Sequence, residues 1–163
     1  MQNKFLNSNK TKNLFTISIF LVLFFTGSQI YTDFGFYIDE KFHRANGFYW
    51  LNYLSAFFGN DNLFELSKLK FEQIQGFTLP SVQKWNLYSV IFDLPAAYLE
   101  LVLNLETQRE YYEMRHFLVF IIFLFGSFFF YKILINRFEN YLVSIFGLIL
   151  FILTPRIFGD SFW

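Results

Sequence analysis

The most constraining feature of the sequence is a set of long stretches that are almost free of charged side chains. Residues 13–32 lie between Lys12 and Asp33 and contain no charge at all. A helix of about 20 apolar residues is long enough to cross the hydrocarbon core of a bilayer. Residues 117–135 carry a single charge, Lys132, near one end, from where a lysine side chain can reach the lipid headgroups. Both stretches predict membrane-spanning helices.

A third apolar stretch, residues 139–155, is slightly short for a span. We therefore expect this span to be extended through Phe138, or the bilayer to be thinned around it.

Overall composition agrees with a membrane protein. Hydrophobic residues make up 55% of the chain and charged residues only 16%, whereas soluble domains carry about 25% charged residues. Lys+Arg and Asp+Glu both number 13, which argues against a basic nucleic-acid-binding protein. Cysteine is absent, which excludes disulfides, thiolate zinc sites and cysteine nucleophiles.

The first stretch could also be a cleaved signal peptide, because Lys4, Lys10 and Lys12 precede it. The residues that follow it, 26–31, contain no small-residue cleavage site. An uncleaved signal anchor is therefore the preferred interpretation.

The distribution of charge predicts the orientation. Lysines occupy the N-terminal tail, and Lys132 and Arg137 lie near the short turn between the second and third spans. The long segment 33–116 holds more acidic than basic residues. The positive-inside rule places the tail and the turn in the cytoplasm and segment 33–116 outside. We expect an all-α, polytopic membrane segment over residues 1–163, with three spans and a long outward loop.

The outward loop is too apolar to be a plain hydrophilic connection. Residues 47–58 are rich in aromatic side chains that favour the membrane–water interface. The pattern of residues 86–105 predicts amphipathic helix at the interface, as either two short helices or one helix kinked at Pro95. We expect Asp93 and Glu100 to face water. The polar stripe of this segment comprises Asn86, Ser89, Asp93, Ala97, Glu100 and Asn104. A fourth span is the alternative, but it would leave two acids in hydrocarbon.

The residues that could carry chemistry follow the first span. Asp39 and Glu40 are adjacent carboxylates, and on a helix His43 would share their side. A carboxylate beside an apolar membrane surface is partly desolvated, which should raise its pKa and suit it as a general base. The alternative is a solvated helix start in which Glu40 pairs with Arg44. A metal-binding role is a further alternative for His43.

Basic residues at the ends of the other spans form a second group of candidates. Arg115 and His116 open the second span, and Arg156 follows the third. Each could anchor its helix at the interface. Alternatively, an arginine could bind a lipid phosphate, because its planar fork matches phosphate oxygens.

Taken together, these features resemble the GT-C glycosyltransferases, polytopic enzymes that take a sugar from a polyprenyl phosphate. The similarity rests on the signal anchor, the Asp39-Glu40 pair opening the long loop, Arg115-His116, and the stretch Thr154-Pro155-Arg156-Ile157-Phe158-Gly159-Asp160-Ser161-Phe162. Protein O-mannosyltransferases and lipid A aminoarabinose transferases belong to this superfamily. The last stretch is similar to one bacterial branch, which implies the inner membrane.

The resemblance implies roles for these residues. Asp39 would deprotonate an acceptor hydroxyl, and Glu40 would orient the acceptor or hold a divalent metal ion. Arg156 would stabilise the leaving phosphate. His43, Arg115, His116 and Asp160 would complete the substrate-binding set. The donor would be a polyprenyl-phosphate-linked sugar, and the acceptor a glycan, lipid or protein.

This sequence departs from the family in two respects. His43 lies one residue further from Glu40 than the corresponding histidine of the mannosyltransferases, and family members have many more spans. We therefore expect residues 1–163 to be the N-terminal segment of a larger enzyme. The alternative is a small non-enzymatic membrane protein whose outer loop binds a partner subunit.

Overall fold

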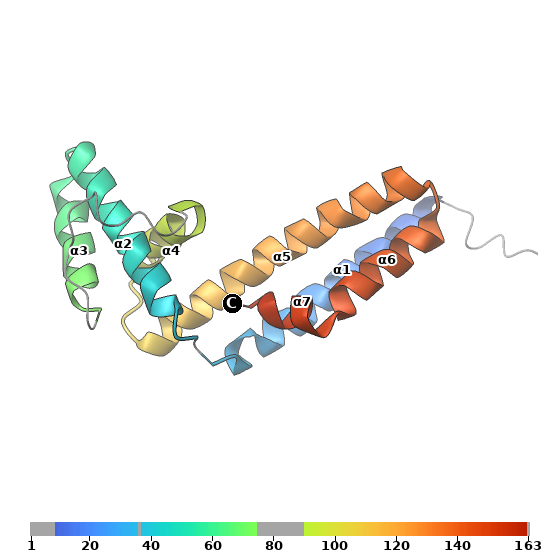
Figure 1. Cartoon of the computed structure of the whole chain (residues 1–163), viewed down its shortest axis with the longest axis horizontal. Coiled ribbons are helices and arrows are strands. Elements are labelled where there is room, and N and C mark those ends of the chain that lie inside the picture. The colour runs from blue at the N-terminus through green and yellow to red at the C-terminus, as the bar shows by residue number, and fades with distance from the viewer. Residues whose placement is uncertain (1–8, 36, 75–89, 163) are drawn as a thin grey trace, which may run out of the picture. The chain divides into compact units, whose positions relative to one another are not determined.

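The computed structural model describes residues 9–35, 37–74 and 90–162. Within them the chain is entirely helical, with seven α-helices, a short 3₁₀ turn and no strand (Figure 1), which confirms the all-α class. The elements are α1 (Asn9–Ile30), η2 (Tyr31–Asp33), α2 (Glu40–Phe57), α3 (Asp61–Glu72), α4 (Val90–Val102), α5 (Gln108–Phe138), α6 (Tyr141–Leu153) and α7 (Pro155–Asp160).

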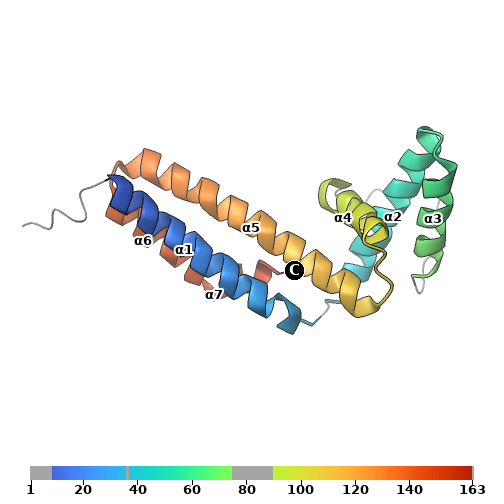
Figure 2. The same ribbon diagram turned by 180° about the vertical axis from the view of Figure 1, so that it is seen from behind.

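The helices form two compact units. Unit 1 comprises Met1–Gly35 and Arg115–Trp163, and unit 2 comprises Phe36–Met114. In unit 1, α1, α5 and α6 run side by side (Figures 1 and 2). Unit 2 corresponds closely to the segment that we expected to lie outside the membrane.

Two helices, α1 with its 3₁₀ extension and α5, are long and apolar enough to cross a membrane. Only 17% of the most apolar window of the first, and 11% of that of the second, is buried inside the protein. Their apolar side chains therefore face mostly outward, unlike those of a helix at the centre of a soluble core.

Aromatic stacking forms the core of unit 1. The Phe162 ring is fully buried and lies 4.3 Å from the Phe34 ring and 5.1 Å from the Phe120 ring, centroid to centroid. Both pairs are stacked. A Cβ added at Gly27 would fall on the Phe120 ring, so this glycine allows α1 and α5 to approach closely.

The start of α1 and the start of α6 lie together in unit 1. The Tyr141 hydroxyl donates to the Lys12 carbonyl at 3.0 Å, and Thr16 Oγ1 donates to the same carbonyl at 3.0 Å. The Lys12 ammonium also lies over the Tyr141 ring. The lysine-bearing end of α1 and the α5–α6 turn are therefore at the same end of the bundle.

The third apolar stretch forms a shorter helix than expected. α6 has 13 residues, and its N-cap is Asn140, whose Oδ1 accepts from the Leu142 amide at 3.0 Å. Glu139 adopts a left-handed φ of 49°, which separates α6 from α5. Extension through Phe138 is therefore wrong, because Phe138 belongs to α5. At the other end, extended Thr154 precedes Pro155 and stops the helix.

In unit 2, α2 packs against both α3 and α4. The aromatic run that we expected at the interface forms most of α2, and its Phe48 and Tyr49 are buried in the core with Phe71 of α3 and Ala97 of α4. Tyr53, Phe57 and Phe58 stay exposed. The run therefore supplies both a protein core and an apolar surface.

Side-chain hydrogen bonds join α3 to α2 and to the segment that follows α4. The Asn52 amide donates to the Phe64 carbonyl at 2.9 Å and to Ser67 Oγ at 3.1 Å. The Lys70 ammonium donates to the Leu105 carbonyl at 2.9 Å. These contacts make unit 2 a packed helical domain rather than a loose loop.

α4 corrects the expectation for residues 86–105. It is one helix that runs through Pro95, while Asn86 and Ser89 lie outside the described residues. Asp93 is 1% exposed and Glu100 is fully buried, so placing both acids toward water is wrong. Within α4 the stripe residues Asp93, Ala97 and Glu100 are buried and face α2, whereas Asn104 lies beyond the helix and is exposed.

Candidate functional site

The expected carboxylate pair lies at the start of α2. Asp39 is the residue before the first turn, and its carbonyl accepts from the His43 amide at 3.2 Å, which establishes the helical spacing from Asp39 to His43. The Asp39 side chain is exposed and makes no capping hydrogen bond. Glu40 Oε1 accepts from the Tyr37 amide at 3.1 Å. Of the two carboxylates, Asp39 is the one presented to solvent.

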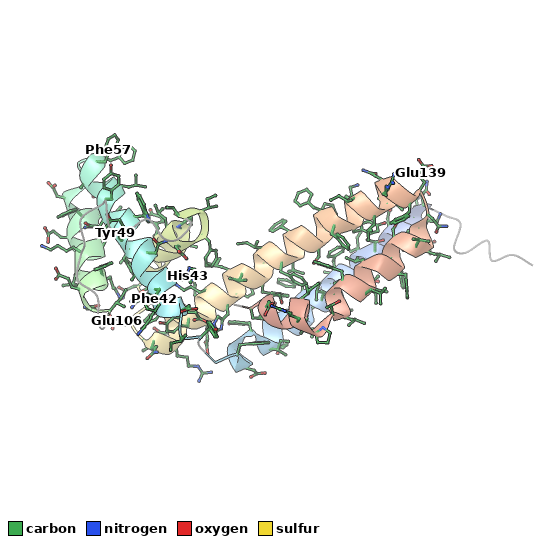
Figure 3. The ribbon with its side chains drawn as sticks, in the orientation of Figure 1. Phe42, His43, Tyr49, Phe57, Glu106 and Glu139 are labelled. Carbon is green, nitrogen blue, oxygen red and sulfur yellow. The ribbon has the colours of Figure 1, made fainter. Side chains whose placement is uncertain are left out.

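His43 is held by a residue of α4. Its Nδ1 lies 3.2 Å from Asp93 Oδ2, and the same oxygen accepts from the Asn46 amide nitrogen at 2.7 Å. Asp93 is buried, whereas the His43 side chain is 44% exposed. Figure 3 shows His43 beside Phe42 at the first turns of α2. The arrangement is an imidazole at the surface, oriented by a carboxylate beneath it.

A second buried pair joins the same two helices. Arg44 Nε lies 3.0 Å from Glu100 Oε2, and its Nη2 lies 2.6 Å from Oε1, so the pairing is bidentate. The Arg44 guanidinium also stacks on the Tyr111 ring, with Cζ 3.8 Å from the centroid. The expected Glu40–Arg44 pair is therefore wrong, because Arg44 turns inward to Glu100.

Small residues let α2 and α4 come close enough for these contacts. A Cβ added at Gly47 would collide with the Asp93 carbonyl oxygen and would lie 2.9 Å from the Ala97 Cβ. Ala45, Ala96 and Ala97 are all fully buried. The close approach brings the short Asp93 side chain within reach of His43 and Asn46.

Three functional candidates were missed in the sequence: Asn46, Asp93 as the partner of His43, and Glu100 as the partner of Arg44. The signal that could have found them is the spacing itself. Two acids seven residues apart on an otherwise apolar helix need polar partners if that face is buried. The cluster His43-Arg44-x-Asn46 supplies such partners.

The remaining candidate residues lie in unit 1. Arg115 and His116 are buried in α5, at 4% and 2% exposure. Arg156 and Asp160 lie one turn apart on α7 and form a loose ion pair, with Nε and Oδ2 separated by 3.7 Å. The Arg156 side chain is 91% exposed, so its guanidinium is accessible from solvent.

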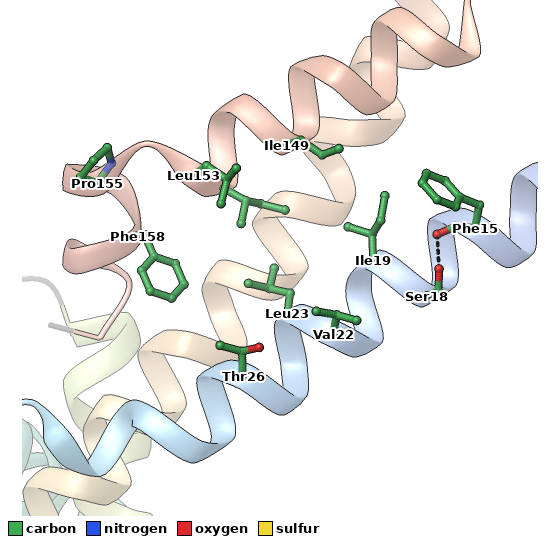
Figure 4. Close-up of a pocket in the computed structure, with 11 residues that line it drawn as sticks. Phe15, Ser18, Ile19, Val22, Leu23, Thr26, Ile149, Leu153, Pro155 and Phe158 are labelled. Carbon is green, nitrogen blue, oxygen red and sulfur yellow. Dashed lines mark hydrogen bonds between the residues drawn. The ribbon is translucent and has the colours of Figure 1, made fainter.

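Unit 1 also contains an apolar pocket of about 520 Å³ between α1 and the α6–α7 corner (Figure 4). Ile19, Leu23 and Thr26 line it from α1, and Leu153 and Phe158 line it from the other side. Its size and apolar walls suit a hydrocarbon chain.

Metal-ligand side chains do not gather anywhere in the described ranges: no group of three or more His, Cys, Asp or Glu is close enough together to hold an ion. The divalent ion that the resemblance allows at Glu40 would therefore need ligands from elsewhere.

No protein-family model, curated protein or solved structure matches this chain. The resemblance to the GT-C enzymes therefore stays a prediction that rests on the residues quoted above.

Proposed function

We propose that this chain is a membrane segment of a GT-C-type glycosyltransferase, which transfers a sugar from a polyprenyl-phosphate donor to an acceptor hydroxyl on the outer face of the membrane. The observation that carries the proposal is the exposed Asp39 carboxylate. It lies in the short connection between α1, which could cross a membrane, and the packed helices of unit 2.

The reaction needs one base and one stabilised leaving group. Asp39 takes the proton of the acceptor hydroxyl, and the oxygen attacks the anomeric carbon of the donor sugar in line. A new carbon–oxygen bond forms, the bond to the lipid phosphate breaks, and the configuration inverts. Polyprenyl phosphate leaves with the electron pair, and a guanidinium stabilises its charge, a role that the family resemblance assigns to Arg156.

The position of the charged residues in unit 1 supports the proposed orientation. Lys12 and the turn that follows Arg137 are at the same end of the bundle, as the Lys12–Tyr141 contacts require. A cytoplasmic location for that end satisfies the positive-inside rule. The opposite end of α1 leads into η2 and then to Asp39.

The outer surface of α4 supports a location at the membrane interface. Ile91, Pro95, Tyr98 and Val102 are exposed along one side of the helix, while its acids are buried against α2. A helix with its charges inside and its apolar side chains outside is suited to contact with lipid rather than with water. We place this face against the headgroup–acyl boundary.

The decisive test is Asp39→Asn in the product of the complete gene, reconstituted with a synthetic polyprenyl-phosphate mannose and native membrane lipid extract. General-base catalysis is worth about 10²–10⁴-fold, so turnover should fall at least about a hundredfold. Donor binding should hardly change, because Asp39 is assigned to the acceptor. Arg156→Ala should instead weaken donor binding.

The matched control is Asp61→Asn, which removes another exposed acid from the first turn of a helix in unit 2. Its turnover should equal that of the wild type. Near-normal turnover of a correctly inserted Asp39→Asn protein would exclude Asp39 as the base.

A second candidate function is the binding of a partner subunit, favoured by the exposed Phe57 and Phe58. Figure 3 shows Phe57 at the end of α2. The partner-binding function predicts that Phe57→Ser with Phe58→Ser abolishes a discrete larger complex on native gels, whereas Asp39→Asn leaves that complex intact. The glycosyltransferase proposal predicts instead that Asp39→Asn strongly lowers sugar transfer, whereas Phe57→Ser with Phe58→Ser leaves transfer intact.

A further inference from the structure

The geometry points to Asp93 as a positioning residue that acts through His43. We infer that Asp93 holds the imidazole with its proton on Nδ1, so that Nε2 accepts a hydrogen bond from the acceptor substrate beside Asp39. This inference rests on the proposed function: it gives His43, an expected substrate-binding residue, a defined role and identifies the group that orients it.

The hydrogen bonds around Asp93 define the direction of each proton. The amide nitrogen of Asn46 can only donate, so Asp93 Oδ2 is the acceptor of that 2.7 Å bond. The same carboxylate oxygen lies 3.2 Å from His43 Nδ1. An ionised carboxylate can only accept, so in this pairing the imidazole donates from Nδ1. With the proton on Nδ1, the other ring nitrogen, Nε2, is the basic one.

Asp93 and His43 differ in how accessible they are to a substrate. Asp93 is 1% exposed and is fixed by the packing of α4 on Gly47. The Arg44–Glu100 pair holds the same two helices together further along α4. The His43 side chain is 44% exposed, one helical turn from exposed Asp39. A substrate group can therefore reach His43 but not Asp93.

The chemistry of the two side chains specifies the class of acceptor. The reacting hydroxyl has one proton, which passes to Asp39. A second hydroxyl of the same acceptor, as on a sugar ring, supplies the hydrogen bond to Nε2 in the arrangement that we infer. Residues one turn apart have Cβ atoms about 5–6 Å apart, within reach of neighbouring hydroxyls on one ring. This geometry favours a sugar of a glycan or glycolipid as the acceptor, because a sugar carries neighbouring hydroxyls on one ring.

The first arm of the test reads the tautomer directly. The complete gene product is labelled with ¹⁵N-histidine and placed in lipid nanodiscs, and the His43 resonances are assigned by their loss in His43→Gln. This chain contributes only two histidines, which limits overlap. We expect the Nδ1–H tautomer in the wild type and its loss in Asp93→Asn. Asp61→Asn, an acid-to-amide change at an exposed position of α3, should leave the tautomer unchanged.

The second arm measures transfer from synthetic polyprenyl-phosphate mannose into native membranes, which offer protein, glycan and glycolipid acceptors together. Loss of one neutral hydrogen bond lowers the rate by about three- to tenfold. His43→Gln and Asp93→Asn should each have this effect, and the double variant should be no slower than either, because Asp93 acts only through His43. The label should appear in glycan or glycolipid.

The outcomes separate the inference from the proposed function. An Nε2–H tautomer in the wild type, or wild-type transfer by His43→Gln, overturns the inference even if Asp39 proves essential. Label found mainly on protein serine or threonine overturns the assigned class of acceptor. A wild-type protein that transfers no sugar overturns the proposed function, and the tautomer measurement then decides the Asp93–His43 pairing alone.

Discussion

The two units of this chain differ in the mixture of side chains that they bury. Each has an apolar core, and unit 1 also buries Arg115 and His116, but only unit 2 buries acidic residues among those that the structure describes. Unit 1 buries mainly aromatic and aliphatic residues such as Phe120, Leu148 and Phe162, and leaves large apolar side chains such as Leu14 and Phe125 exposed. Unit 2 buries Arg44, Asp93 and Glu100 at the contact between α2 and α4. An apolar exterior is stable in lipid, whereas charged residues at an interior require specific partners.

This difference shows that low charge in a sequence has two distinct causes. In α1 and α5 it reflects a surface suited to hydrocarbon. In α4 the few charges are essential to packing, because each of the two acids pairs with residues of α2. Substitutions that remove a charge should therefore destabilise unit 2. The stability of unit 1 should instead depend on whether lipid or water surrounds its apolar surface.

The largest expected effect on stability comes from Glu100→Ala. It leaves the buried Arg44 guanidinium without its carboxylate, and breaking a buried ion pair costs about 3–5 kcal/mol. Thermal unfolding followed by circular dichroism in detergent should show the loss. Arg109→Ala removes an exposed ion pair in the same unit and should cause no resolvable change.

A joint replacement sharpens this prediction. Arg44→Met with Glu100→Leu removes both charges at once and should recover most of the stability that Glu100→Ala loses, because no isolated charge remains. If the double variant unfolded as easily as Glu100→Ala, lost packing rather than lost charge pairing would account for most of the destabilisation.

A smaller effect is expected from Gly47→Ala. The new Cβ would collide with the Asp93 carbonyl oxygen and push α4 away from α2, and such overpacking costs about 1–3 kcal/mol. The same thermal scans would measure it. Gly126→Ala is the control in unit 1: nothing lies near its Cβ position, so it should be neutral or slightly stabilising.

The smallest effect concerns alkaline pH. Burial in the core of unit 2, with a contribution from the charge of Tyr53, raises the pKa of Tyr49 above its ordinary value. Neutral Tyr49 is favoured in the folded protein. Its contribution to stability is therefore fully present below the ordinary tyrosine pKa of about 10, and is lost as the pH rises through the raised pKa of the folded state. Tyr49→Phe should shift the alkaline unfolding midpoint upward, and an unchanged midpoint would contradict this.

The sequence predicted those features that depend on long apolar runs. The all-α class and the two long apolar helices followed from residues 13–32 and 117–135. The buried face of α4 was not predictable from its own pattern, because a stripe with Asp93 and Glu100 suits water as well as a polar partner helix. Only the tertiary contact through Gly47 and Ala97 distinguishes the two.

At the site, helical spacing correctly placed His43 one turn after Asp39. The partner of His43 could not be inferred, because Asp93 lies 50 residues further along the chain and on another helix. The same reasoning failed for Arg44, for which Glu40 was the nearest acid in sequence but not in space.

The most direct test of the contrast between the two units is the side of the membrane on which each lies. This chain contains no cysteine, so Glu65→Cys on α3 and Asn136→Cys near the end of α5 would each provide a single thiol in it. Both positions are exposed in the protein. A membrane-impermeant maleimide applied to intact cells should label Glu65→Cys at once and Asn136→Cys only after permeabilisation. Labelling of both from the same side, or of Glu65→Cys only from inside, would contradict an outward unit 2 joined to a membrane-spanning unit 1.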